Sequence, residues 1–439
     1  MWSTPHNTRA PEREETSITS KRFRRIKMAR TAIAGVPEMS QITPSTGQRP
    51  RIGVLMPAGR VVENVGVVTH TFGSPEKATR LFTNIGDCFV YDSSLRILDY
   101  AELYPIYASA NGDISEAQIE KINQLDYLFL RGSNYIHTNG QWDPIIRVLE
   151  RTKVPVIAFG IGVQTPDNSE DYVNESTKRF LQIVSHRSAT LGVRGNLSKK
   201  ALNSIGIKNV RVFGCPTAFR HCKPKLSLPR IKANEIKRLG FTLRRKTHGF
   251  GTLQRYLMRT LAERYQTEFL CAGELEEKAI FYARCNQIAN ADEVMAKAVN
   301  QLIKERWLYG ENDPILQLYK SSLAVFETVA DFEEAERHLD AVTGFRLHGN
   351  LLALANEVPA LYITYDTRTR EFVKTLGIPH VDGRYIDKFS FEEAWDQADF
   401  GHFEETYQMR FGELKTFLEE NSMAHRLGAT PTPYVVEAA

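Results

Sequence analysis

The sequence has few cysteines, and their spacing indicates neither a metal site nor a disulfide framework. The five cysteines, at positions 88, 215, 222, 271 and 285, are scattered along 439 residues and form no Cys-x-x-Cys pair. No His, Asp or Glu cluster has metal-ligand spacing either. An odd, dispersed set of cysteines in a chain of this length is typical of reduced thiols in the cytosol. We therefore expect no required metal, no cofactor and a cytoplasmic protein.

Long apolar runs are also lacking. No segment approaches the roughly 20 apolar residues that a transmembrane helix needs. The N-terminal segment carries charge but no apolar core, so we expect no secretory signal peptide. The hydrophobic content of 42% is ordinary for a globular protein, and the length allows two or more domains.

Charge is distributed unevenly along the chain. The first fifty residues hold nine Lys or Arg against four Asp or Glu, whereas the whole chain has a net charge of only +4. The excess lies in Lys21–Arg30, among Ser, Thr, Pro and Gln, which predicts a disordered basic tail over residues 1–49. Phe23 and Ile26 allow a second interpretation, peripheral contact with anionic lipid at the inner face of the membrane. A start at Met28 would remove most of this cluster. The rest of the chain is not basic, so no nucleic-acid partner is expected.

A dinucleotide-binding fingerprint is missing as well. Gly160 and Gly162 end an apolar run, but Thr165 stands where the fingerprint needs a third glycine. Glycines at a strand end still allow backbone N–H groups to approach a ligand closely. Gly162 is therefore kept as a candidate ligand contact.

From residue 51 onward, short apolar runs alternate with stretches of helical periodicity, which predicts a parallel α/β architecture. Strands are expected at 51–56, 103–109, 126–130, 154–163, 189–194, 209–213, 239–243, 268–272, 323–328, 341–345 and 359–365. Helices are expected at 87–100, 115–124, 142–151, 174–187, 196–205, 253–264, 274–283, 291–304, 332–339, 350–356 and 391–421.

The alternation stops once, over residues 216–237, where breaks and basic residues follow one another without periodicity. We interpret this segment as a linker. It separates an N-terminal Rossmann-like domain (50–215) from a C-terminal Rossmann-like domain (238–385), and a helical extension (386–439) follows. The expected fold is therefore α/β, with two Rossmann-like domains and a cleft between them.

The stretch around residue 346 carries the clearest chemistry. Ala341 to Phe345 is predicted as a strand and Arg346-Leu-His-Gly349 as the turn that leaves it, before the next helix. Arg346 and His348 thus fall at the carboxyl end of a strand beside a helix N-terminus, where anions bind in parallel α/β sheets. An isolated Arg–His pair could instead serve only the local backbone carbonyls.

The motif Arg346-Leu-His-Gly349 is followed by an Ala-rich helix, a Val358-Pro strand and the segment Tyr365-Asp-Thr-Arg-Thr-Arg-Glu-Phe372. Upstream, Asn84-Ile-Gly-Asp87 precedes a helix, and Gly192-Val-Arg194 ends a strand before a Ser-bearing helix. In this order, these motifs resemble those of the polysaccharide pyruvyl transferase family. The resemblance extends through most of the two predicted domains.

Three positions depart from the family pattern. Cys215-Pro216 stands where an acidic residue is usual, Arg131-Gly-Ser replaces a glycine triplet, and Arg368 occupies a position where Lys is frequent. Arg131 could be an added ligand contact or a surface loop residue. Asp87 likewise allows two interpretations, a cleft residue or an ordinary helix cap.

The resemblance implies a GT-B-like fold and an enzyme that transfers the pyruvyl group of phosphoenolpyruvate to a sugar of an exopolysaccharide or cell-surface glycan. The product is commonly a ketal bridging two hydroxyls, and phosphate is released. The acceptor could be a lipid-linked oligosaccharide. Neither the acceptor sugar nor the oligomeric state follows from the sequence.

The implied donor carries a phosphate and a carboxylate, and both suit the planar guanidinium fork. We assign catalytic roles to His348, Arg346 and Arg194, with His348 as general acid because its ordinary pKa lies near neutrality. The substrate-binding candidates are Arg368, Asp87, Asn84, Gly349, Asn350, Gly162 and Arg131.

Two other classes of function remain open at this point. A nucleotide-sugar glycosyltransferase on the same architecture would bind a nucleoside diphosphate in the second domain. A glycan-binding relative that has lost catalysis, suggested by the departures at Arg131 and Cys215, would bind ligand and release no phosphate.

Overall fold

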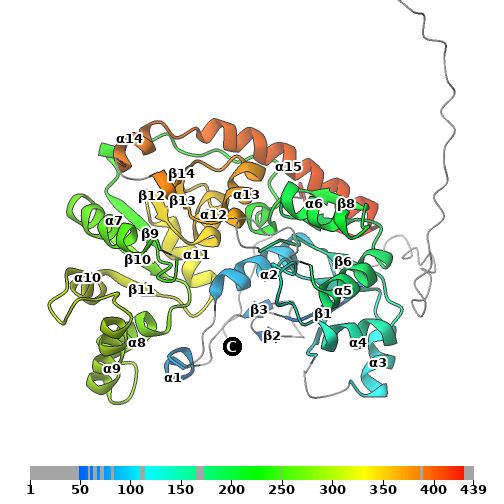
Figure 1. Ribbon diagram of the computed structural model, residues 1–439. Helices are drawn as coiled ribbons and strands as arrows, with labels where there is room; N and C mark the ends of the chain where they lie inside the picture. The colour runs from blue at the N-terminus through cyan, green and yellow to red at the C-terminus, as the bar shows by residue number, and fades with distance from the viewer. Residues whose placement is uncertain are drawn as a thin grey trace, which may run out of the picture. The chain divides into compact units, whose positions relative to one another are not determined.

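Two parallel β-sheets with helices packed against them make up most of the described chain (Figure 1). The computed structural model describes residues 49–57, 60–62, 67–69, 74–80, 84–108, 114–164, 173–247, 249–385 and 389–429. The predicted basic tail, its membrane contact and the alternative start at Met28 lie outside these residues, apart from Arg49. None of the described helices is both long enough and apolar enough to cross a bilayer.

The first sheet comes from the N-terminal half of the chain and is parallel throughout. Its strands follow the order β4-β1-β5-β6 and continue into β7-β8 through a parallel bridge between Ile161 and Val193. The strands are β1 (Arg51–Leu55), β4 (Glu102–Ile106), β5 (Tyr127–Leu130), β6 (Val156–Ala158), β7 (Leu191–Val193) and β8 (Val210–Val212). The helices are α2 (Ile85–Ile97), α3 (Glu116–Asn123), α4 (Asp143–Arg151), α5 (Glu175–His186) and α6 (Asn196–Ser204). The chain changes direction between β1 and β5, which is the switch point of a doubly wound sheet.

The second sheet has six parallel strands in the order β11-β10-β9-β12-β13-β14, the order of a dinucleotide-binding fold. The strands are β9 (Arg238–Thr242), β10 (Gln266–Cys271), β11 (Leu323–Val325), β12 (Ala341–Gly344), β13 (Ala360–Thr364) and β14 (His380–Asp382). The helices are α7 (Gly251–Arg264), α8 (Leu275–Arg284), α9 (Ala291–Lys304), α10 (Pro314–Ser322), α11 (Val329–Arg337), α12 (Leu347–Ala355) and α13 (Thr367–Leu376). Its switch point lies between β9 and β12. The predicted α/β fold with two Rossmann-like halves is therefore confirmed.

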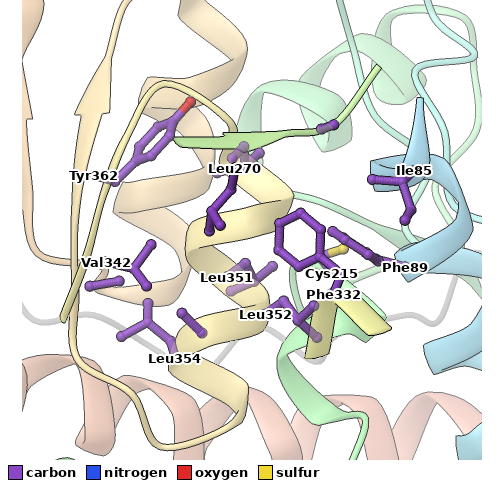
Figure 2. Packing of buried hydrophobic residues seen from close by; sticks show 14 of the residues in the cluster. Ile85, Phe89, Cys215, Leu270, Phe332, Val342, Leu351, Leu352, Leu354 and Tyr362 are labelled. Carbon is purple, nitrogen blue, oxygen red and sulfur yellow. The ribbon is translucent and has the colours of Figure 1, made fainter. Parts of the chain in front are cut away.

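Helix α12 is buried along nearly its whole length, and its last five residues are all Leu or Ala. Leu351 and Leu352 are fully buried and lie on the side of Phe332 and Phe89, whereas Leu354 lies on the side of the sheet (Figure 2). The rings of Phe89 and Phe332 are 4.9 Å apart. Burying one such leucine contributes about 1.5–3 kcal/mol. Since Phe89 belongs to α2, the apolar core is continuous between the two halves.

Polar contacts also join the halves. Arg220 is fully buried, and its guanidinium forms ion pairs with Asp92 of α2 at 3.0 Å and Glu333 of α11 at 2.8 Å. In addition, the backbone N–H of Ile85 donates to the carbonyl of Ala272 at 2.9 Å. Arg220 lies in the segment predicted as a linker, and the short 3-10 helix Pro216–Phe219 before it is buried as well. Much of this segment therefore packs inside the protein rather than crossing its surface.

The C-terminal region departs from the single helix predicted over 391–421. It forms α14 (Phe391–Asp396) and α15 (Phe400–Glu420), because Asp399 caps a new helix start by accepting from the N–H of His402 at 2.8 Å. Helix α15 then packs against the first sheet, with the ring of Phe417 5.3 Å from that of Phe159 (Figure 1). A chain that ends by returning to its first half is consistent with a GT-B-like arrangement.

Several smaller elements were not predicted. Helices α10 and α13 are absent from the expected set. Between β1 and α2, where no strand or helix was expected, lie the antiparallel pair β2 (Arg60–Val62) and β3 (Val67–Thr69) and the short helix α1 (Pro75–Ala78).

Candidate active site

A cleft of about 980 Å³ lies between the two halves, at the carboxyl ends of the strands of the second sheet. This is where a doubly wound sheet binds its ligands. Residues of both halves line it. The lining includes seven of the predicted site residues, namely Asn84, Asp87, Arg194, Arg346, His348, Gly349 and Arg368.

The motif around His348 was predicted as a turn that precedes a helix. In the structure it is the first turn of that helix. Arg346 is the N-cap residue of α12, and the helix begins at Leu347. A Cβ atom at position 349 would lie 2.8 Å from Cγ2 of Thr242 on β9. The helix can start here because Gly349 has no such atom. The amide of Asn350 then donates to Oγ1 of Thr242 at 2.8 Å and to the carbonyl of Arg346 at 2.9 Å. Asn350 thus fixes the helix on the sheet and lies outside the cleft lining.

Arg346 connects the two halves at the floor of the cleft. Its Nε donates to the carbonyl of Leu243 at 3.0 Å, and its guanidinium forms an ion pair with the buried Glu274. A further long contact of 3.5 Å reaches Oδ1 of Asn84, which caps α2 by accepting from the N–H of Gly86. Asn84, and not Asp87, is therefore the cap of this helix. These contacts hold the guanidinium of Arg346 in one place.

Arg194 follows strand β7 and is almost completely buried. Its Nη1 donates to Oδ1 of Asn134, and its guanidinium lies 5.3 Å from the ring centre of Phe372. Gly162 provides the space, because a Cβ atom there would lie 2.6 Å from Cδ of Arg194. Gly162 was predicted to contact the ligand. In the structure it packs against Arg194 and does not line the cleft. Burial lowers the pKa of Arg194.

Arg368 lies in the first turn of α13, a helix that was not predicted from the sequence. Its Nη2 donates to the hydroxyl of Tyr365 at 3.0 Å and lies 3.4 Å from the carboxylate of Asp366. Burial opposes the charged form, but Tyr365 and Asp366 outweigh it and hold the pKa of Arg368 above its ordinary value.

Arg244 is a cleft residue that was missed. It follows β9 as Arg346 follows β12, so both arginines lie beside the switch point of the second sheet. Its guanidinium lies 5.7 Å from the ring centre of Tyr365 and makes no hydrogen bond or ion pair with any residue in the described ranges. Burial lowers its pKa. The signal that could have found it is its place directly after a buried strand at the reversal of strand order.

His348 lies among these arginines on α12. Its Nε2 atom is buried and has no hydrogen-bond partner among the described residues, and its ring packs at 6.1 Å against the edge of Phe372. Burial lowers the pKa of His348 well below its ordinary value, and the charges of Arg194, Arg368, Arg346 and Arg131 lower it further. The imidazole is therefore neutral at pH 7 in the free protein.

The arginines of the cleft are not fully compensated. Glu274 and Asp366 pair with Arg346 and Arg368, whereas Arg194 and Arg244 have no carboxylate partner within the described part of the chain. Because burial makes an uncompensated charge costly, two such groups beside one neutral imidazole indicate a site for a multiply charged anion. The described His, Cys, Asp and Glu residues form no group that could hold a metal ion.

Comparison with known proteins identifies the family. The family model described as polysaccharide pyruvyl transferase matches residues 78–367, which is more than half of the chain. The protein belongs to the polysaccharide pyruvyl transferase family. A search of curated protein sequences found no match.

Solved structures also match this pyruvyl transferase family member, at low sequence identity. A UDP-GlcNAc 2-epimerase from Neisseria meningitidis has 13% identity and a TM-score of 0.42, covering 84% of this chain and 99% of its own. The N-terminal domain of trehalose-6-phosphate phosphatase from Candida albicans has 9% identity and a TM-score of 0.38, covering 88% and 97%. S. aureus TarM has 10% identity and a TM-score of 0.37, covering 69% and 56%.

Of the positions that depart from the family pattern, Arg368 lines the cleft, whereas Arg131 and Cys215 lie behind its lining. Arg131 donates through Nε to the carbonyl of Met56 at 3.1 Å, and its Nη1 lies 3.8 Å from the half-exposed Asp87. It therefore joins the ends of β1 and β5 and orients an acid of the cleft. Cys215 is fully buried, where burial raises the pKa of its thiol. A buried neutral thiol is unreactive.

Proposed function

We propose that this protein transfers the pyruvyl group of phosphoenolpyruvate to a sugar and releases phosphate. The observation that supports this proposal most directly is the surplus of guanidinium charge, from Arg194 and Arg244, around the neutral His348. Phosphoenolpyruvate carries close to three negative charges on two oxyanions, a phosphate and a carboxylate. Both are groups that guanidinium forks bind bidentately.

The positions of the arginines suit a donor of this size. Arg244, Arg346 and Arg368 belong to the second half and Arg194 to the first, so a small anion between them is held by both halves. The N–H groups at the start of α12, which has no side-chain cap, add partial positive charge at the same cleft. Fixed cations and dipoles of this kind stabilise charge that develops on departing phosphate without reorganisation.

In this proposal, His348 transfers the proton. As general acid, it donates a proton to the methylene carbon of the donor, which leaves an oxocarbenium-like centre at C2 for attack by a sugar hydroxyl. A second hydroxyl then replaces phosphate at the same carbon, and the C2–O bond to phosphate breaks. One hydroxyl proton balances the new methyl group and the other leaves with phosphate. The neutral imidazole takes up its proton once the donor charge is bound, since a nearby anion favours the protonated form.

The proposal is tested with phosphoenolpyruvate and a panel of hexose-terminated acceptors, by measuring released phosphate and product mass. Pyruvyl transfer predicts a product that is heavier than the acceptor by one pyruvyl ketal. It also predicts that one phosphate is released for each product molecule. Thermal-shift measurements with phosphoenolpyruvate and with nucleoside diphosphates run alongside. If only nucleotides stabilise the protein and no phosphate is released, pyruvyl transfer is rejected and the result favours glycosyl transfer. Sugar binding without turnover of either donor would indicate an inactive relative.

A further inference from the structure

The part of the cleft wall formed by residues 133–142 and Gln164 differs from the arginine-rich part. Every side chain that lines it is an amide, a hydroxyl or an aromatic ring. The residues that line this wall are Ser133, Asn134, His137, Thr138, Asn139, Trp142 and Gln164. Burial lowers the pKa of His137, so this ring is neutral at pH 7. The wall therefore offers hydrogen bonds and an apolar ring without charge.

Trp142 is held firmly in this wall. One contact is a stacked pair with Phe180 of α5, at 5.4 Å and 28°, and the ring of Tyr135 lies 5.2 Å away in an edge arrangement. The indole Nε1 donates to Oγ1 of Thr177 at 3.1 Å, and the backbone N–H of Trp142 donates to Oγ of Ser176 at 2.9 Å. Since the ring is only partly buried and lines the cleft, it offers a fixed aromatic surface there.

The amides of the wall are oriented by the donor-side arginine. Arg194 donates to Oδ1 of Asn134, which turns the Asn134 amide nitrogen toward Gln164, and this nitrogen donates to Oε1 of Gln164 at 3.0 Å. The Nε2 group of the exposed Gln164 is thus left as a donor with no partner among the described residues. A relay of two hydrogen bonds therefore runs from the anion-binding arginines to the uncharged wall.

We propose that this wall binds an uncharged pyranose ring of the acceptor, packed on Trp142 and hydrogen-bonded through its hydroxyls to the amides of Asn134 and Gln164. The inference rests on the proposed function, because it names the acceptor subsite of the same cleft. A pyranose has an apolar C–H face that suits an aromatic ring and hydroxyls that suit amides. A phosphate or carboxylate on the sugar would lose solvation at this wall and find no cation among the side chains that form it.

Saturation-transfer NMR on the full-length protein tests the subsite, with methyl β-galactopyranoside and its 6-phosphate as probes. We expect transfer to the uncharged sugar, its loss in Trp142→Ala, partial retention in Trp142→Phe and weakening in Gln164→Ala. Tyr309→Ala, which removes an exposed ring outside the cleft, is the matched control and should behave as wild type. In steady-state assays, the acceptor KM of Trp142→Ala should rise about tenfold with the donor KM unchanged.

The outcomes separate this inference from the proposed function. Sugar binding that depends on Trp142 without phosphate release from phosphoenolpyruvate supports the subsite and rejects pyruvyl transfer. Phosphate release with an unchanged acceptor KM in both Trp142→Ala and Gln164→Ala rejects the subsite alone. Tighter binding of the 6-phosphate than of the uncharged sugar also rejects it. Should Trp142→Ala fail to fold by circular dichroism, Gln164→Ala decides, because Gln164 is exposed and supports no packing.

Discussion

The two sides of the cleft occupy comparable edges of their sheets and differ in chemistry. On the second half, Arg244 and Arg346 follow the strands at the switch point and face the ligand space. At the switch point of the first half, Arg131 instead bonds the carbonyl of Met56 and does not line the cleft, and the lining contributed by residues 133–142 is uncharged. The doubly wound topology thus determines where ligands bind, and the side chains after each strand determine which ligands. In the proposed reaction, the arginine-rich part would hold the anionic donor and the uncharged wall the neutral acceptor.

The largest effect should come from His348, at the border of the two sides. His348→Ala should lower phosphate release by about 10²–10⁴-fold, because it removes the proposed general acid and leaves the arginines in place. Donor affinity, measured by calorimetry with phosphoenolpyruvate, should be retained. His338→Ala, which replaces the exposed residue that follows α11, is the control. A His348 variant that is folded and fully active would remove the imidazole from the mechanism.

The next largest effect should come from removing one partner of the buried Arg346–Glu274 ion pair. Arg346→Gln should destabilise the protein by about 3–5 kcal/mol, since it leaves Glu274 buried without its cation. Urea unfolding measures this loss. The double variant with Glu274→Gln should recover much of it, because no uncompensated charge then remains. Arg244→Gln should cost little stability, as Arg244 has no ion-pair partner among the described residues. Equal destabilisation by Arg244→Gln and Arg346→Gln would show that pairing is not what distinguishes them.

Much of the fold was predictable because the strands are short apolar runs, and burial on both faces of a parallel sheet produces such runs. Helix boundaries were less certain where one residue decided the geometry. The start of α12 was placed too late because Gly349 resembles a turn residue, whereas here it permits close packing on Thr242. The break before α15 depends on a single cap, Asp399.

The site was predictable only in part, for a different reason. Motif residues such as Arg194 and Arg346 lie in the cleft, but their partners carry no local signal. Glu274 lies 72 residues from Arg346, and Asn134 lies 60 residues from Arg194. Pairings over such distances follow from the packing of the two halves and not from any periodicity. Trp142, at the start of a predicted helix, likewise gave no sign that it would line the cleft.

Neutralising single arginines should sharpen the difference between the two sides. Arg194→Gln and Arg244→Gln should each raise the donor KM by about ten- to a hundredfold, the range expected for a lost hydrogen bond to a charged group. Only Arg194→Gln should also raise the acceptor KM, because Arg194 orients Asn134 and, through it, Gln164. Arg306→Gln, an exposed arginine outside the cleft, is the control. Identical acceptor KM values in Arg194→Gln and Arg244→Gln would contradict the relay.

The smallest expected change is a shift along the pH axis. In the free protein, burial and then the arginine charges lower the pKa of His348, so the imidazole gains a proton only below its ordinary range. Bound donor brings negative charge to the same arginines, which raises this pKa. As general acid, His348 is active when protonated, so both kcat and kcat/KM fall as pH rises, and the fall in kcat should occur at higher pH.

The donor phosphate itself titrates near pH 6, which complicates kcat/KM, so the direct measurement is the imidazole signal of His348 by NMR. The titration is followed in the free protein and with phospholactate, an analogue without the vinyl group, and assigned with His348→Gln. An upward shift of the His348 pKa on binding would show that the bound anion offsets the positive charge of the arginines around the imidazole. An unchanged or lowered pKa would mean that the anion binds away from His348, and the proton would then need another source.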